Sequence, residues 1–298
     1  MSQIRKYFGL FIFAGIALGF FLPGPVLPLK PYLIFLLGIM MFLSCLKISV
    51  KDILLVERDW WKYLVLMAIV FLLSSLVVFA FKGLLSDIAF VGLMVIAAAP
   101  SAIAVVFLAD VLGGEPHKAL IGTTLAQLFA PLLTPFLVWT FAHQSVAIDT
   151  MAMFLVIAKL VLIPFILAQI ARRFGWDKMI LKKAGWVNEF LLFLLIWATM
   201  APASGAIKVN MNEFWIALGI VAVLLIVQAT AGFSFGRGKR EKITWTVIAI
   251  SKNFTVASVL ALTLFGAGSL VGPAAFVFLS NAVLVPLEWW SLHKKHKN

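Results

Sequence analysis

The sequence predicts an all-α membrane protein in which ten transmembrane helices form two inverted five-helix repeats. Three observations support this prediction. Long apolar runs follow one another through the 298 residues, which are 63% apolar and 12% charged, with a mean hydropathy of +1.10. The basic residues gather in alternate loops. Features of the first half also recur 151 residues later in the second half.

Ten apolar runs are long enough to cross a bilayer, and polar, glycine or proline turns separate them. The predicted spans are 7–22, 31–47, 61–83, 88–111, 117–141, 149–171, 186–206, 212–235, 242–266 and 270–291. The first run resembles a signal peptide, but no small-residue cleavage site follows it, so we count it as a helix. Its GxxxG motif, Gly15 and Gly19, predicts a close-packing face within the bundle.

The distribution of basic residues predicts the orientation of the chain. Nineteen of the 24 Lys and Arg residues fall on one side of the predicted bundle, and only Lys30, Lys82 and Lys208 fall on the other. This asymmetry predicts a multi-pass protein of the plasma or inner membrane with both termini in the cytoplasm. The net charge of +12 is spread over loops and forms no single patch, so we expect the lipid bilayer as a partner and no nucleic acid.

The ninth span, 242–266, contains Ser251-Lys252-Asn253 at its middle, with Thr255 two residues further on. A charged side chain at bilayer depth costs about 2.5–3.5 kcal/mol on insertion scales, so it remains only where it meets protein or water. Polar backbone at this depth is tolerated where a helix breaks beside a cavity. The sequence therefore predicts two half-helices, about 242–251 and 254–266, that meet at a polar joint.

An internal repeat supports a second break. A shift of 151 residues brings Pro100-Ser101-Ala102 onto Ser251-Lys252-Asn253, and it also aligns Pro135 with Pro286 and Trp139 with Trp290. Pro100 removes a backbone donor, so the fourth span should break where the ninth does. Five helices per repeat is an odd number, so the repeats, 1–146 and 147–298, should have opposite orientations within one membrane domain. Paired broken helices in inverted repeats are typical of secondary transporters.

Two stretches of the sequence resemble the bile acid:sodium symporter family. They are APSAIAVVFLADVLGG…KALIGTTLAQLFAPLLTPFLVW (99–139) and SKNFTVASVLALTLFG (251–266). The resemblance implies a core domain and a panel domain, with the fourth and ninth helices crossing as broken helices in the core. It also implies transport of a small organic anion by alternating access, usually together with sodium.

The chain departs from this family where the family holds sodium. Val105-Val106 stand where the family has Ser-Asn, Lys252 replaces a glutamine, and a glutamate position falls at about Ile248. The third span, 61–83, also lacks the family's glutamine. Because sodium needs several oxygen ligands and is repelled by a nearby ammonium, we expect no sodium coupling. A conventional sodium symporter that uses backbone carbonyls at 248–252 is the alternative, and a proton is the other candidate coupling ion.

The candidate substrate-binding residues are the polar or helix-breaking residues inside the spans: Pro100, Ser101, Thr124, Gln127, Lys159, Ser251, Lys252, Asn253 and Thr255. Lys252 has two interpretations: it pairs with the anion or titrates, or it is a structural cation that neutralises the carbonyl ends of half-helices. Ser101 either caps the second half-helix or touches the substrate. We interpret Ser74, Ser75 and Gln228 as packing or backbone-bonding residues.

The remaining residues exclude most other classes of protein. Cys45 is the single cysteine, and the four histidines lie in predicted loops or the tail, so the sequence predicts no disulfide, no metal site and no cofactor. No pattern of catalytic side chains is present, so we predict that the protein is not an enzyme. The run from Asn253 also resembles arsenite efflux permeases, but those carry a cysteine in the fourth helix. A non-transporting receptor or a channel is the last alternative.

Overall fold

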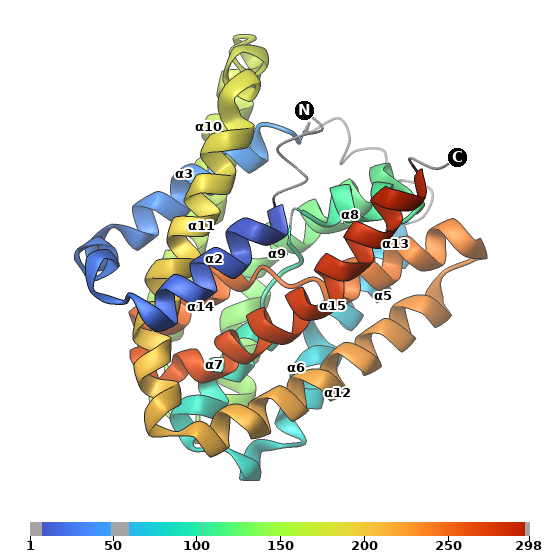
Figure 1. Cartoon of the computed structure of the whole chain (residues 1–298). Helices are drawn as coiled ribbons and strands as arrows, with labels where there is room; N and C mark the ends of the chain where they lie inside the picture. Colours follow the sequence, from blue (N-terminus) through green and yellow to red (C-terminus); the bar gives the residue numbers. More distant parts are fainter. Residues whose placement is uncertain (1–7, 49–59, 103, 296–298) are drawn as a thin grey trace.

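The computed structural model describes residues 8–48, 60–102 and 104–295, and most of these residues are helical (Figure 1). Within these ranges the only β-type pairing is one isolated bridge. Five residues used for the charge count, Arg5, Lys6, Lys51, Arg58 and Lys297, lie outside the described part of the chain, as do both termini.

The described helices follow the predicted order of apolar runs. The first half contains α2 (Phe8–Phe21), the 3₁₀ helix η1 (Gly24–Tyr32), α3 (Leu33–Cys45), α5 (Trp60–Met67), the π-helix η3 (Ala68–Leu73), α6 (Ser74–Phe79), η4 (Lys82–Leu84), α7 (Asp87–Ala97), α8 (Val105–Val111) and α9 (Pro116–Ala142). The second half contains α10 (Thr150–Arg173), α11 (Asp177–Val209), α12 (Met211–Phe235), α13 (Gly238–Ile250), α14 (Phe254–Phe265), η5 (Ala267–Leu270) and α15 (Val271–Lys295).

Six helical segments of the described chain are long and apolar enough to cross a membrane alone. They are Gly24–Cys45, Trp60–Phe79, Pro116–Ala142, Thr150–Arg173, Ala184–Val209 and Met211–Phe235. Shorter apolar helices occupy the other predicted spans: Phe11–Phe21, Asp87–Ala97, Phe254–Phe265 and Ala267–Val283. The protein is therefore an all-helical chain with the composition of a membrane protein.

Two local features differ from the prediction. The third span changes to π-helix over Ala68–Leu73, a geometry that often marks a functional site. Helix α11, which contains the seventh predicted span, already begins at Asp177. The basic residues Lys178, Lys182 and Lys183, which we expected in a loop, therefore lie in this helix. Lysine is a good helix former, and the negative charge of Asp177 in the first turn interacts favourably with the positive amino end of the helix dipole.

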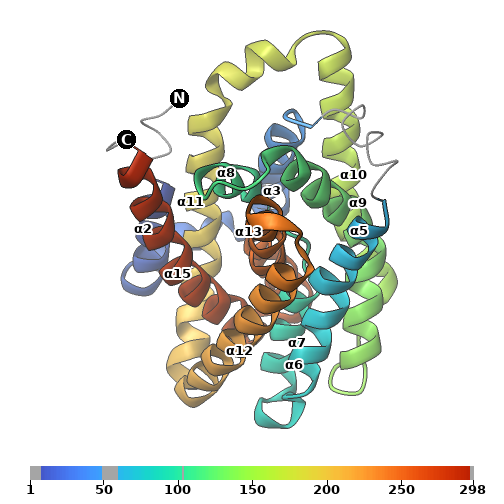
Figure 2. The same cartoon turned by 90° about the vertical axis from the view of Figure 1, so that its right-hand side faces the viewer.

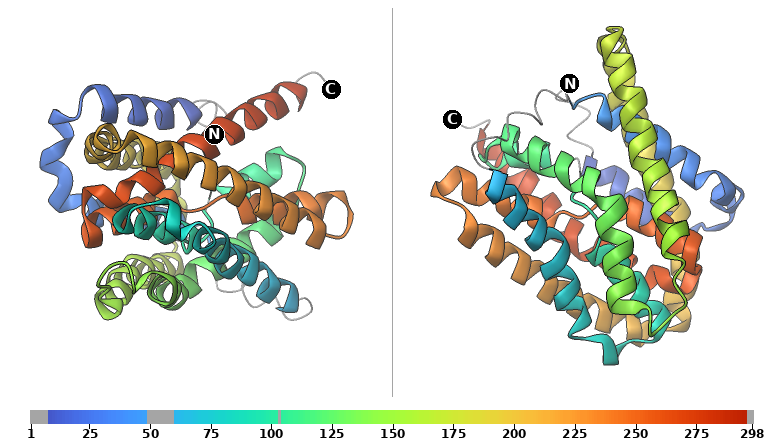
Figure 3. Two further views of the ribbon diagram at one scale, coloured as in Figure 1. Left: turned by 90° about the horizontal axis from the view of Figure 1, so that it is seen from below. Right: turned by 180° about the vertical axis from the view of Figure 1, so that it is seen from behind.

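The helices separate into two groups. Helix α2 packs along α11, and α3 packs against both α10 and α11, so these four helices form one side of the bundle, at the left in Figure 1. In the other group α7 packs against α9, α14 and α15, while α12 packs against α13 and α15. Helix α9 also lies beside α10, as Figure 3 shows from behind. The expected division into a panel and a core stays a prediction.

The GxxxG motif of α2 lies directly against α11. A Cβ atom added at Gly15 would stand 3.0 Å from the Phe193 carbonyl oxygen. One added at Gly19 would stand 2.4 Å from the Met200 Cβ. The prediction of a close-packing face within the bundle is confirmed, and glycine is required at Gly19 because only hydrogen fits there.

Two helix starts recur at one spacing. Helices α7 and α13 begin at Asp87 and Gly238. Helix α9 and the 3₁₀ helix η5 begin at Pro116 and Ala267. Each pair of starts is 151 residues apart, the shift that aligned the two halves of the sequence.

Candidate functional site

Both predicted helix breaks are present, and they meet. Helix α7 ends at Ala97 and α8 begins at Val105, while α13 ends at Ile250 and α14 begins at Phe254. Figure 2 shows α8 and α13 side by side near the centre of the bundle. Pro100 accounts for the first break because it lacks an N–H and disfavours helix at the residue before it.

The chain at the two breaks pairs as a short antiparallel bridge between Ser101 and Lys252. The Asn253 N–H donates to the Pro100 carbonyl over 2.7 Å, and the Ala102 N–H donates to the Ser251 carbonyl over 2.9 Å. A shift of 151 residues converts one of these bonds into the other. We call residues 100–102 and 251–253 the joint. Its buried backbone groups are satisfied across the two halves of the chain.

The side chains of the bridged residues follow the same relation. The Ser101 hydroxyl donates to the Ile248 carbonyl over 2.8 Å, and the Lys252 ammonium donates to the Ala97 carbonyl over 2.8 Å. Residues 97 and 248 are again 151 positions apart. The Ser101 hydroxyl therefore satisfies a carbonyl in the last turn of α13, and the Lys252 ammonium satisfies a carbonyl in the last turn of α7. Carbonyls in the last turn of a helix have no hydrogen-bond partner within that helix. Ser101 does not cap α8, which was one of the predicted roles.

Lys252 is 1% exposed and reaches further than Ser101. Its ammonium also donates to the Val70 carbonyl, to the Ser74 hydroxyl over 3.0 Å, and to the Ala99 carbonyl over 3.3 Å. Gln228 donates its side-chain amide to the same Ser74 oxygen. An ammonium has three hydrogens, and these acceptors are sufficient for all of them.

The sequence-based prediction missed the roles of Val70, Ser74 and Gln228. Ser74 and Gln228 are polar residues in the middle of apolar spans, and this position was the signal from which their role could have been predicted. Ser74 and Ser75 also make the predicted backbone bonds, to the Val70 carbonyl over 2.6 Å and to the Phe71 carbonyl over 2.8 Å. A main-chain acceptor such as Val70 leaves no signal in the sequence.

Several polar atoms at the joint lack partners among the described residues. The Ser251 hydroxyl and the Gln127 side-chain oxygen are buried without a hydrogen bond. Gln127 donates its amide nitrogen to the Ser101 carbonyl over 2.9 Å, which ties α9 to the joint. Asn253 caps α14 by accepting from the Val256 N–H over 3.2 Å, and no hydrogen bond of its amide nitrogen is found in the described chain. Thr255 lies in the first turn of α14 and is 4% exposed.

Two predicted site residues are not brought to the joint by hydrogen bonds. The Thr124 hydroxyl donates to the Leu120 carbonyl of its own helix over 2.7 Å, which is the backbone-bonding interpretation. Lys159 is exposed on α10 and forms no hydrogen bond to any described residue.

A cluster of charges fixes the start of α13, the half-helix that leads into the joint. The Glu241 carboxylate is paired with Lys62 at 3.1 Å and Lys118 at 2.9 Å, and it accepts from the Arg237 N–H over 2.7 Å. Burial opposes the charged form, but the hydrogen bonds from Lys118, Arg237 and Lys62 outweigh it and lower the pKa of Glu241 to about 2. The cluster therefore joins the starts of α5, α9 and α13 near neutral pH.

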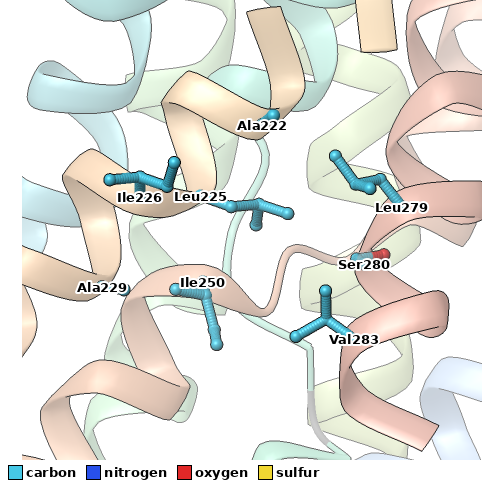
Figure 4. Close-up of a pocket in the computed structure, with 8 residues that line it drawn as sticks. All are labelled: Ala222, Leu225, Ile226, Ala229, Ile250, Leu279, Ser280 and Val283. Atoms are coloured by element: carbon cyan, nitrogen blue, oxygen red, sulfur yellow. The ribbon is translucent and has the colours of Figure 1, made fainter. Parts of the chain in front are cut away.

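An apolar cavity of about 340 Å³ opens beside the joint (Figure 4). Its walls are Ala222, Leu225, Ile226 and Ala229 of α12, Ile250 at the end of α13, and Leu279, Ser280 and Val283 of α15. Ile226 and Val283 are exposed, so the cavity opens at the surface of the bundle. It lacks the polar atoms that would orient a charged ligand.

Comparison with known proteins decides the family. The model of the SBF-like CPA transporter family matches residues 6–279. The chain belongs to this family. Membership fits the resemblance to bile acid:sodium symporters seen at the joint residues. Membership in a transporter family and the several apolar helices make the chain a multi-pass membrane protein, and the family name is consistent with the prediction that it is not an enzyme.

Two relatives match the chain at low identity. The chain is 27% identical over 184 residues to a Bacillus subtilis protein named "Uncharacterized sodium-dependent transporter YocS", a match that covers 58% of the chain and 57% of the relative. It is 24% identical over 257 residues to "Uncharacterized protein PA2026" of Pseudomonas aeruginosa, which covers 80% of the chain and 75% of that protein. The first match thus spans little more than half of the relative's length.

Proposed function

We propose that the protein is a secondary active transporter that carries a small organic anion by alternating access and needs no sodium. Ten spans in two inverted repeats, 1–146 and 147–298, provide the architecture, and both termini lie in the cytoplasm. The observation that carries the proposal is the joint, where two broken helices meet through paired backbone bonds deep in the bundle.

The inverted repeat is supported by the spacing of the joint and of the helices. Hydrogen bonds at the joint occur in pairs that a shift of 151 residues interchanges. The starts of α7 and α13, and of α9 and η5, have this spacing as well. A pseudo-two-fold axis through the Ser101–Lys252 bridge would produce this arrangement, and it makes rocking of one helix group against the other the natural transport motion.

The substrate site is supported by the unused polar atoms at the joint. The Ser251 hydroxyl and the Asn253 amide nitrogen are donors, and both lie at the amino end of α14, where the helix dipole favours an anion. Gln127 is fixed by Ser101 and keeps one amide oxygen for a substrate hydroxyl. Thr255 adds a hydroxyl one residue beyond the start of α14.

Lys252 does not contact the substrate in this proposal. Its ammonium is surrounded by protein acceptors, so no hydrogen is left for an anion. Of its two predicted interpretations we adopt the structural one, in which a cation neutralises the carbonyl ends of helices. Thr124 is bonded within its own helix and Lys159 is exposed on α10, so neither is part of the proposed site.

A sodium symporter is the second candidate, because the Bacillus subtilis relative is named sodium-dependent. Of the carbonyls at 248–252 that would replace the missing side-chain ligands, those of Ile248, Ser251 and Lys252 already accept hydrogen bonds from the protein, which leaves those of Ala249 and Ile250. This observation favours the sodium-independent candidate.

The test is the apparent melting temperature of the purified protein with a panel of small mono- and dicarboxylates, in sodium or in potassium buffer. A ligand that binds the folded state at one hundred times its dissociation constant adds about 2.7 kcal/mol of stability. We expect one carboxylate class to stabilise the protein equally in both salts. Stabilisation only in sodium would favour the symporter, and stabilisation by no anion would contradict the proposal.

A further inference from the structure

The Lys252 ammonium lies in a cage of four oxygen atoms. The ligands are the main-chain carbonyls of Val70, Ala97 and Ala99 and the Ser74 hydroxyl. The ammonium lies 2.8 Å from the Ala97 oxygen, 3.0 Å from the Ser74 oxygen and 3.3 Å from the Ala99 oxygen. The ion pairs of the described chain do not include Lys252. A positive charge removed from water and surrounded only by neutral oxygens has the environment of a bound alkali or ammonium ion.

The oxygen atoms of the cage come from segments of the chain other than the one that carries Lys252. Val70 lies in the π-helix η3, and Ala97 is the last residue of α7, at the negative end of its dipole. The Ser74 hydroxyl is oriented from two sides, because it donates to the Val70 carbonyl over 2.6 Å and accepts from Gln228. The oxygens are therefore positioned by the protein independently of α13 and α14.

The other half of the joint shows what a shorter side chain does at the equivalent position. Ser101 makes only the bond to the Ile248 carbonyl, the counterpart of the bond from Lys252 to Ala97. It is fully buried, so a serine is compatible with the bridge. The contacts of Lys252 with Val70, Ser74 and Ala99 are therefore not needed to form the Ser101–Lys252 bridge.

The cavity in the second half supports the same comparison. Leu225 and Ile250, which line the cavity, stand 151 positions after Ser74 and Ala99, which line the cage. Two of the eight residues that line the cavity thus correspond to two of the four that line the cage. Shortening Lys252 should therefore leave the cage oxygens around an unfilled space.

We propose that this cage is a monovalent-cation site that the protein fills with its own side chain. When Lys252 is shortened, free ammonium or potassium occupies the site. The Ala97 and Ser74 oxygens lie within the N–H···O range of about 2.7–3.2 Å from the ammonium, a spacing that suits these two ions better than the smaller sodium. A role of this site in ion-coupled transport rests on the proposed function, whereas binding of a cation to the site can be tested without transport.

The experiment uses the purified full-length Lys252→Ser protein, titrated with ammonium, potassium, sodium or choline chloride at constant ionic strength. We expect Lys252→Ser to melt below the wild type in choline. Ammonium and potassium should raise its melting temperature saturably, by about 5 °C at one hundred times the dissociation constant, and sodium should act more weakly. The wild type should respond equally to all four salts.

Three controls separate the cage from general salt effects. Lys252→Met fills the same space with an uncharged chain and should gain nothing from ammonium. Lys159→Ser removes the other predicted intramembrane lysine, which is exposed on α10, and should behave as the wild type does. Adding Ser74→Ala to Lys252→Ser removes one ligand and should weaken ammonium binding about ten-fold.

A Lys252→Ser protein that melts at the same temperature in all four salts would overturn the inference. So would equal responses of Lys252→Ser and Lys252→Met, or failure of both Lys252→Ser and Lys252→Ala to fold in saturating ammonium. If the proposed function also holds, anion uptake by Lys252→Ser becomes dependent on ammonium or potassium. Cation stabilisation without uptake would contradict the transport proposal alone and leave the cage in place.

Discussion

Asn253 combines an observed task and a proposed task at the scale of the single residue. Its side-chain oxygen caps α14, and we propose that its amide nitrogen donates to the ligand. The sequence predicted both the polar joint and the importance of this residue, because an amide at bilayer depth is a local signal. The partners of Lys252 could not be predicted in this way, since three of them are main-chain carbonyls from helices distant in sequence.

Substituting Asn253→Asp tests the second task. The carboxylate still accepts from the Val256 N–H, so the cap of α14 should persist, but the donor is lost and a negative charge faces the anion. We expect the affinity for the stabilising carboxylate to fall at least about 100-fold, with a melting temperature close to that of the wild type without ligand. Asn188→Asp, which retains its bond from Ser44, is the matched control and should leave the affinity unchanged. Unaltered affinity in Asn253→Asp would remove this residue from the site.

Glu241 provides a prediction about pH. Its pKa in the folded protein is lowered to about 2 from 4.5, so its stabilising effect is complete above pH 4.5 and is lost as the pH falls toward 2. Glu241→Gln should therefore lower the melting temperature at pH 7 by the equivalent of about 1–3 kcal/mol. The difference from the wild type should shrink steadily below pH 4.5 in a melting series from pH 7 to pH 3. Glu115→Gln, which breaks a partly exposed pair with Lys118, should have a smaller effect. A pH-independent difference would contradict this assignment.

At the scale of the element, the breaks were predictable and the contacts between helices were not. Pro100 and the run from Ser251 to Asn253 interrupt apolar sequence, and each break depends on local chemistry. The π-helix over Ala68–Leu73 carries no comparable mark, because its residues are all apolar. The GxxxG motif predicted close packing but not its partner, since the choice of α11 depends on the whole fold.

Gly19→Val tests the contact between α2 and α11. The new side chain would collide with Met200 at its Cβ and at its backbone, which cannot turn away as a flexible side chain could. We expect destabilisation of about 1–3 kcal/mol in thermal unfolding. Gly38→Val in α3 is the matched control, because an added Cβ there meets nothing within 4 Å. Equal melting temperatures for the two variants would show that α2 does not pack on α11 in this way.

At the scale of the whole molecule, the family and the all-helical fold followed from composition and from the joint residues. The ten-span count, the inverted repeats and the division at residues 146 and 147 remain predictions, supported by the 151-residue spacing of helix starts and hydrogen bonds. The substrate remains a proposal for a physical reason. The donors at the joint support an anionic ligand, but in the proposed alternating access the side chains that would enclose it belong to surfaces that move against each other.

The central claim is transport of an anion without sodium, and counterflow in proteoliposomes tests it most directly. Vesicles loaded with the stabilising carboxylate are diluted into a trace of the labelled compound, with sodium, potassium or choline on both sides. The account predicts equal, saturable accumulation of label in all three salts and its loss in Asn253→Asp. Accumulation that requires sodium would contradict the account.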